Sequence, residues 1–496
     1  MHPSLTIMTL LLPLRRLVCG LLLALVAAPV LASPGLTLPD LGSVTLDNMG
    51  SAQERALGRA IVNEIRRQGA LVEDPELNEY IQNLGSRLAS SYGGGDYTFF
   101  LVKDDNINAF ALPGGYIGVH TGLMRRTRTE SELASVIAHE IAHVTQKHIA
   151  RRYQASNASN LKTLGLLLGA IAIAAAGGDS DDVAGTLMLG QGLAIQEQLN
   201  FTRAQETEAD RVGLNILTRA DFNPQGMVSF FQVMQRFERL QSTRRLEFMS
   251  THPLSTSRVV EAAQRVQAMG AKPGRESRTY PLMHARIQAF YVDGNELGGQ
   301  MTVATTDDPL ATRYLKALRL LDKGQAREAA TILGELKNEE IDRASFHIGH
   351  GRALVAAGDR EAAMDVLGKA RLLFPESTPV ALTYAEALDT FGETDKAYSF
   401  LDSFFNRHSP PVEAIRYLAR LASALDKVGK SHYLMSEYYL RTGEGDRARI
   451  QLQLALQVEG ISQTEELQYR ARLEELEGAL AAVRRTSREK DDRKPR

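Results

Sequence analysis

The sequence contains one short motif whose residue types and spacing suit metal chemistry, His139-Glu140-Ile141-Ala142-His143. Residues four apart stand one turn apart on the same face of an α-helix, so both imidazoles can reach one metal ion. Glu140 is one residue further round the helix, where its carboxylate can approach a water bound to that metal. The motif predicts a zinc-dependent hydrolase.

A catalytic zinc has three protein ligands and one open position, so a third donor must come from elsewhere in the chain. Residues 203–219 have a helical pattern that puts Glu206 and Asp210 on one face. Glu206 is the favoured ligand, with Asp210 one turn later as its support. Glu208 is the alternative, but it points about 200° away from Glu206 around the helix axis.

The helix that presents the first motif is expected over about residues 131–151. Thr129 with Glu132 matches a capping box, and apolar residues follow at helical spacing. On a continuous helix His148 lies about 180° from His139 around the axis. We therefore exclude His148 from the metal site.

The composition excludes several broad classes of protein. Apolar residues make up 44% of the 496 residues and charged residues 23%, which is ordinary for a soluble globular protein. The net charge of -2 lacks the basic excess of a nucleic-acid-binding protein. A chain of this length exceeds one hydrophobic core, so two or three folded units are expected.

Residues 1–32 are predicted to be a cleaved signal peptide. Two arginines precede an apolar run over residues 17–28, and small residues stand three and one positions before a cut after Ala32. An uncleaved anchor and a mitochondrial presequence are the alternatives. The single cysteine, Cys19, lies in this segment, so any metal in the mature chain must be held by His, Asp or Glu.

Three short strands are expected over residues 97–102, 108–112 and 116–119, from their aromatic and β-branched residues. A Pro-Gly-Gly turn separates the last two, which indicates a small antiparallel sheet. The middle strand, with Asn108 and Phe110, is either an edge strand that binds an extended substrate or an ordinary core strand.

One apolar run after the first motif has two interpretations. Residues 164–178 are shorter than the roughly 20 residues that cross a bilayer. Burial as a core helix is favoured over a lid or a peripheral membrane contact.

The last third of the chain repeats with a period of 34 residues. Gly324, Gly358 and Gly392 are each preceded four residues earlier by leucine and followed five residues later by alanine. This is the tetratricopeptide period, in which the glycine turns the chain between two antiparallel helices. A further unit is expected at Gly443, with an extra helix over residues 412–427 interrupting the array.

Three motifs together resemble the M48 family of zinc metallopeptidases: His139-Glu140-Ile141-Ala142-His143, Glu206-Thr207-Glu208-Ala209-Asp210, and Thr251-His252-Pro253-Leu254 with Arg258. The resemblance implies an α+β, mostly helical protein, in which a gluzincin-type peptidase domain with a small antiparallel sheet precedes an all-α repeat array. The expected boundaries are 33–270 for the peptidase domain, 271–308 for a linker, 309–484 for the repeats and 485–496 for a charged, disordered tail.

The resemblance also implies roles for single residues. One zinc ion per chain would be held by His139, His143 and Glu206, with Glu140 as the catalytic base and Asp210 orienting a ligand imidazole. His252 would lie at the zinc site, either assisting the oxyanion or filling the open coordination position in a latent state. Arg258 would position His252 or contact substrate.

The resemblance further implies a periplasmic protein in quality control of outer-membrane proteins. Its partners would be misassembled β-barrel proteins and, through the repeats, the β-barrel assembly machinery, but no nucleic acid. Two functions stay open: an active endopeptidase, or a chaperone or scaffold whose zinc site is latent.

Overall fold

The computed structural model describes residues 51–149, 151, 203–240, 251–270, 274, 277–291 and 308–491. The predicted signal peptide and the apolar run over 164–178 lie outside these residues. The described part is mostly helical with one small sheet, as the sequence predicts. No helix within it is long and apolar enough to cross a membrane.

The sheet has the strand order β1-β3-β2, with β1 at Thr98–Val102, β2 at Ala109–Leu112 and β3 at Tyr116–His120. The β2 and β3 strands are antiparallel, but β1 runs parallel to β3. The expectation of a wholly antiparallel sheet is therefore wrong. The turn at Pro113–Gly115 inserts β3 between the two earlier strands, so β1 pairs with the strand that runs in its own direction.

In the part of the chain that the structure describes, two helices precede the sheet, α2 at Ser51–Arg67 and α3 at Pro75–Ser90, and α4 follows it at Thr121–Arg126. The Asp74 side chain caps α3 by accepting hydrogen bonds from two backbone amides of its first turn. One face of α3 buries Leu77, Ile81 and Leu88 against the sheet and the motif helix. This core fixes the sheet beside the motif.

The motif helix is α5, at Glu130–Thr145. Thr129 caps it by accepting from the Glu132 amide, and the Glu132 carboxylate accepts from the Arg128 amide. The helix ends six residues before the predicted end at 151. Lys147 has a φ of 52°, in the left-handed region, and a new helical turn begins at His148.

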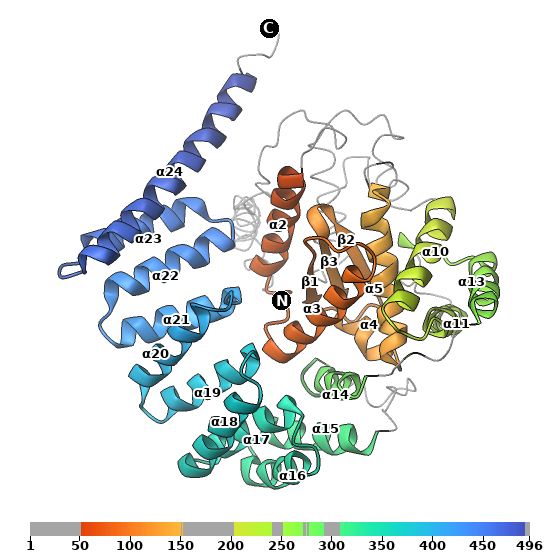
Figure 1. The fold of residues 1–496 in the computed structure, drawn as a ribbon, viewed down its shortest axis with the longest axis horizontal. Coiled ribbons are helices and arrows are strands. Elements are labelled where there is room, and N and C mark those ends of the chain that lie inside the picture. The colour runs from red at the N-terminus through yellow and green to blue at the C-terminus, as the bar shows by residue number, and fades with distance from the viewer. Residues whose placement is uncertain are drawn as a thin grey trace, which may run out of the picture. The chain divides into compact units, whose positions relative to one another are not determined.

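Among the described residues of the predicted peptidase domain, three helices follow α5: α10 at Arg203–Arg219, α11 at Gln225–Leu240 and α13 at Thr256–Met269. Both α10 and α11 pack on α5, as Figure 1 shows. Gly213 makes the close approach of α10 possible, because a Cβ there would lie 3.3 Å from the backbone nitrogen of His139. The approach brings the acidic face of α10 to the motif.

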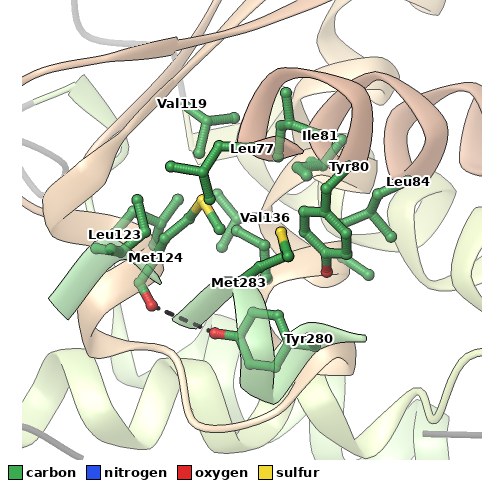
Figure 2. Close-up of a cluster of buried hydrophobic side chains, with 14 of the residues drawn as sticks. Leu77, Tyr80, Ile81, Leu84, Val119, Leu123, Met124, Val136, Tyr280 and Met283 are labelled. Carbon is green, nitrogen blue, oxygen red and sulfur yellow. Dashed lines mark hydrogen bonds between the residues drawn. The ribbon is translucent and has the colours of Figure 1, made fainter. Parts of the chain in front are cut away.

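The predicted linker over 271–308 contains a buried helix, α14, at Tyr280–Phe290. Figure 2 shows Tyr280 and Met283 among side chains of α3, α4 and α5. The Tyr280 hydroxyl donates to the Met124 carbonyl, and Arg286 pairs with the buried Asp74 at 2.6 Å. Part of the predicted linker is thus a helix whose buried residues pack on α3, α4 and α15.

The repeat region is a series of antiparallel helices (Figure 1). Their bounds are α15 Pro309–Asp322, α16 Ala326–Glu339, α17 Ala344–Ala356, α18 Arg360–Leu373, α19 Thr378–Thr390, α20 Thr394–Phe405, α21 Val412–Ala424, α22 Val428–Arg441, α23 Gly445–Gln457 and α24 Gln463–Asp491. Gly324, Gly358 and Gly392 have φ values of 76° to 80° at the turns. The predicted role of these glycines is confirmed.

The predicted extra helix before the fourth unit is present as α21. Gly443 has a φ of 78° in the turn between α22 and α23, and its amide donates to the Leu440 carbonyl as the Gly324 amide does to Leu321. The turn at Gly443 thus has the geometry predicted for the fourth unit. Asp426 forms a further turn of this kind between α21 and α22, with a φ of 57°, because aspartate tolerates the left-handed conformation.

The charged tail predicted for residues 485–496 is helical in part. The last helix, α24, runs to Asp491, and residues 492–496 of the predicted tail lie outside the described chain.

Candidate metal centre

Four buried side chains place potential ligand atoms in one cluster: His139, His143, Glu206 and His252. One nitrogen or oxygen from each lies within 4.8 Å of the corresponding atoms of the others. The two histidines come from α5, Glu206 comes from the first turn of α10, and His252 precedes α13. The structure thus brings together the donors that the separate motifs predicted.

The spacing of these atoms suits a small metal ion. His143 Nε2 lies 2.9 Å from His139 Nε2, and Glu206 oxygens lie 3.4 and 3.5 Å from the same two nitrogens. Ligands about 2.0–2.1 Å from a tetrahedral zinc are separated by roughly 3.3 Å. The donor set, two imidazoles and a carboxylate, is also one that zinc accepts.

The second nitrogen of His139 is held by Asp210. Its Nδ1 lies 2.9 Å from Asp210 Oδ1. Arg258 donates to both oxygens of Asp210 and pairs with Glu206 at 2.6 Å. Because Asp210 and Arg258 are buried, this ion-paired group orients both His139 and Glu206 without help from solvent.

The charge distribution favours a cation at the centre of the cluster. Burial would lower the pKa of His139, but the carboxylates of Glu206 and Asp210 raise it to about 10. Burial lowers the pKa of His143 well below its ordinary value. Burial would raise the pKa of Glu206, but His252 and His139 hold it well below its ordinary range. The site therefore holds a carboxylate and one proton that a metal ion would displace.

Glu140 has the environment of a general base. Its carboxylate is 1% exposed, and its Oε1 atom makes no hydrogen bond within the described chain. Burial raises its pKa, while a hydrogen bond from the Ala111 backbone, in β2, opposes that rise. A raised pKa brings a carboxylate closer to the range in which it can take up and return a proton near neutral pH.

His252 touches both the donor cluster and the base. Its Nδ1 lies 3.1 Å from Glu206 Oε1 and 3.3 Å from His139 Nε2. Its Nε2 lies 3.5 Å from Glu140 Oε1. In this conformation the imidazole supplies a fourth donor and stands beside the base.

A model of peptidase family M48 matches residues 73–266. The beta-barrel assembly-enhancing protease of Escherichia coli strain K12 is 30% identical over 480 residues, which are 93% of this chain and 96% of that protein. The chain belongs to peptidase family M48. The putative beta-barrel assembly-enhancing protease of Vibrio cholerae is 35% identical over 340 residues, 66% of this chain and 69% of that protein. A solved thermophilic TPR protein of Thermus thermophilus covers 43% of this chain and 96% of its own, with 19% identity and a TM-score of 0.19.

Peptidases of family M48 use zinc, so the predicted zinc cofactor and the enzyme class are confirmed. This chain is a zinc metalloendopeptidase with a donor cluster of the kind that such an enzyme requires.

The strand β2 of this M48 peptidase has one edge toward β3 and one edge away from it. The His120 amide donates to the Asn108 carbonyl, so residues 108 and 110 direct their backbone groups toward β3. Ala109 and Ala111 therefore direct theirs to the outer edge, beside Glu140. The Phe110 side chain is buried against the rings of Phe100 and His120, and a contact of residues 108 and 110 with substrate stays a prediction.

Arg258 was expected either to position His252 or to contact substrate, and the structure favours the first role. The guanidinium is buried, and its Nη1 donates to the carbonyl of Pro253, directly after His252. Its remaining contacts with Asp210 and Glu206 were not foreseen. The only sequence signal was a basic residue a few positions after the His-Pro pair.

His148 lies beside the metal centre without belonging to the donor cluster. Its Nδ1 is 2.8 Å from the Nδ1 of His143, and its Nε2 is 3.2 Å from Glu208 Oε2. The exclusion of His148 as a metal ligand agrees with the four-residue donor cluster of the described chain. Its contact with His143 was not predicted, because the prediction assumed a continuous helix and α5 ends at Thr145. Glu208 does not join the four-residue donor cluster of the described chain, in agreement with its predicted direction.

Proposed function

We propose that this M48 peptidase works in the periplasm and hydrolyses peptide bonds of misassembled outer-membrane β-barrel proteins. In this proposal His139, His143 and Glu206 are the zinc ligands and Glu140 is the base. The observation that carries the catalytic assignment is the convergence of these buried groups. The names of the relatives and the signal-like N-terminus support the client class and the location.

The chemistry follows from the positions of the side chains. A zinc ion held by His139, His143 and Glu206 would supply an acidified water and a polarised carbonyl. Glu140 would take up the proton of the attacking water and return it to the leaving amine. Asp210 and Arg258 hold His139 and Glu206 in place.

The outer edge of β2 is the proposed seat of the substrate. The Ala111 amide donates to Glu140, so an extended peptide would pair with the Ala109 backbone and the Ala111 carbonyl and would run beside Glu140. Main-chain pairing does not depend on particular substrate side chains, which suits a peptidase that acts on unfolded chains in an extended conformation. In this proposal Asn108 and Phe110 pair with β3 through their backbone groups and hold β2 in the sheet.

A second function is supported by the position of His252. Its Nδ1 atom lies among the zinc-binding donors, so the site in this conformation has four protein donors, as closed structural zinc sites do. A protein held in this state would act as a chaperone or scaffold through its repeats, which would also dock the β-barrel assembly machinery. Repeat arrays offer extended concave surfaces for such partners.

Cleavage of urea-denatured β-barrel protein by the purified full-length enzyme tests the proposal, with Glu140→Gln as the decisive variant. Loss of the base should lower the rate by about 10²–10⁴-fold while zinc content stays equal. A folded barrel and an unfolded water-soluble protein serve as substrate controls. Equal cleavage by Glu140→Gln would refute the catalytic assignment, and equal cleavage of all unfolded substrates would refute the client class.

A further inference from the structure

His148 contacts His143 on the side of the ring that faces away from the donor cluster. The two Nδ1 atoms are 2.8 Å apart, and the rings meet edge to face with centroids 4.8 Å apart. The Nε2 atom of His143 points into the cluster, 2.9 Å from His139 Nε2. Metal binding through Nε2 therefore leaves Nδ1 of His143 directed at His148.

The positions of the protons follow from this arrangement. A His143 ring that binds metal through Nε2 carries its hydrogen on Nδ1, so this group donates and His148 Nδ1 accepts. His148 then carries its own hydrogen on Nε2, which donates to Glu208 Oε2 at 3.2 Å. An ionised carboxylate can only accept, so Glu208 determines the tautomer of both rings.

Glu208 is itself held in place. Arg151 Nη2 donates to the same Oε2 atom at 2.7 Å. The arrangement repeats the plan seen at the other histidine, where His139 contacts Asp210 and Asp210 is held by Arg258. Each imidazole of the motif is thus linked to a carboxylate that pairs with an arginine, directly for His139 and through His148 for His143.

The two arms differ in length and exposure. The His139 arm uses one buried carboxylate, whereas the His143 arm passes through a second imidazole to a carboxylate whose side chain is 39% exposed. The left-handed Lys147 makes the longer arm possible, because it ends α5 and turns the chain so that His148 returns to His143.

We infer that His148 and Glu208 are positioning residues for the metal centre. They keep the hydrogen of His143 on Nδ1 and hold its ring so that Nε2 faces the metal. The inference rests on the proposed role of His143 as a zinc ligand and adds to it two residues that do not touch the metal. Outer partners of this kind strengthen metal binding by fixing a ligand before the metal arrives.

The test measures the dissociation constant of Zn²⁺ by competition with a chelating dye, on the full-length protein. His148→Leu removes the acceptor, His148→Asn restores one, and Glu208→Gln removes the carboxylate at the surface. Glu261→Gln is the matched control, because Glu261 of α13 is also a part-exposed carboxylate held by an arginine, Arg211 of α10. Tautomers of the His143 ring are read from ¹⁵N shifts of the metal-free protein.

The expected result for His148→Leu is zinc binding weakened by about 10–100-fold, with a mixture of His143 tautomers. His148→Asn should recover most of the affinity, and Glu208→Gln should lose a smaller part. Glu261→Gln should match the wild type. A wild-type zinc affinity in His148→Leu overturns the inference. Equal zinc affinities of Glu208→Gln and Glu261→Gln also overturn it, because both substitutions are at part-exposed side chains and should leave the protein folded.

His143→Ala separates this inference from the function on which it rests. If His143→Ala binds zinc as the wild type does, the proposed ligand assignment fails. If His143→Ala loses zinc while His148→Leu and Glu208→Gln keep it, the ligand assignment stands and only the positioning role fails.

Discussion

Arg258 holds Asp210 by two hydrogen bonds, from Nε to Oδ2 at 2.7 Å and from Nη2 to Oδ1 at 2.8 Å. Both side chains are buried, and the same Oδ1 atom lies 2.9 Å from Nδ1 of His139. The planar guanidinium thus sets the angle at which a carboxylate meets a ligand imidazole. A compact ammonium group cannot reproduce this two-point contact.

Arg258→Lys is expected to weaken zinc binding by about 10–100-fold, because Asp210 loses one of its two anchors and His139 loses its fixed orientation. Competition with a chelating dye measures the change. Arg265→Lys is the control, since Arg265 lies on the same helix in a half-exposed pair with Glu261. Unchanged zinc affinity in Arg258→Lys would show that the two hydrogen bonds from the guanidinium to Asp210 are not needed for zinc binding.

Zinc binding should release about one proton per ion near pH 8, since ligands must be deprotonated to bind a metal. His139 has its pKa raised to about 10 by Glu206 and Asp210 against the effect of burial, whereas His143 has its pKa lowered by burial and is already neutral. Calorimetric titration in buffers of different ionisation enthalpy measures the number. A binding enthalpy independent of the buffer would contradict this charge assignment.

The same shift sets a pH dependence for the zinc-free protein. The folded pKa of His139 lies above the ordinary value of 6.5, so its stabilising contribution is complete below about pH 6.5. The contribution is lost as pH rises toward about 10. The melting temperature of the zinc-free protein should fall across this range more than that of His139→Gln.

His252→Ala is expected to raise cleavage of unfolded substrate roughly tenfold, which corresponds to about 1.4 kcal/mol of preference for the closed arrangement. The reason is that the imidazole stands among the donors and beside Glu140 in this conformation. Initial rates at equal zinc content measure the effect. The double variant with Glu140→Gln should be inactive. A large fall in rate would instead assign His252 to the oxyanion.

Gly213→Val should destabilise the fold by about 1–3 kcal/mol and weaken zinc binding. A Cβ at this position lies 3.2 Å from Met227 Cε and 3.3 Å from the His139 nitrogen, so the larger branched side chain must push α10 from α5. Glu206 and Asp210 would move with α10. Gly368→Val, where a Cβ meets nothing within 4 Å, is the control. Thermal unfolding and zinc titration compare the two variants.

Local pattern was sufficient for much of the fold. Helix α10 has the bounds expected from its apolar spacing, and the three strands lie where β-branched and aromatic residues cluster. The repeat glycines predicted the positions of their turns, because few other residues adopt a positive φ. Asp426 adopts it too, and no sequence pattern distinguishes such an aspartate from one on a helix surface.

The sequence by itself determined the chemistry: two imidazoles on one face of a helix with a carboxylate beside them, and an acidic pair on another helix, can be inferred from spacing because helix geometry is regular. Only the tertiary structure decided which side chains and helices hold these groups in place. The partner of Arg258, the burial of α14 and the return of His148 onto His143 all depend on contacts between distant elements or on one residue, Lys147, in a left-handed conformation. Helical periodicity does not predict where a helix ends when a tertiary contact determines that end.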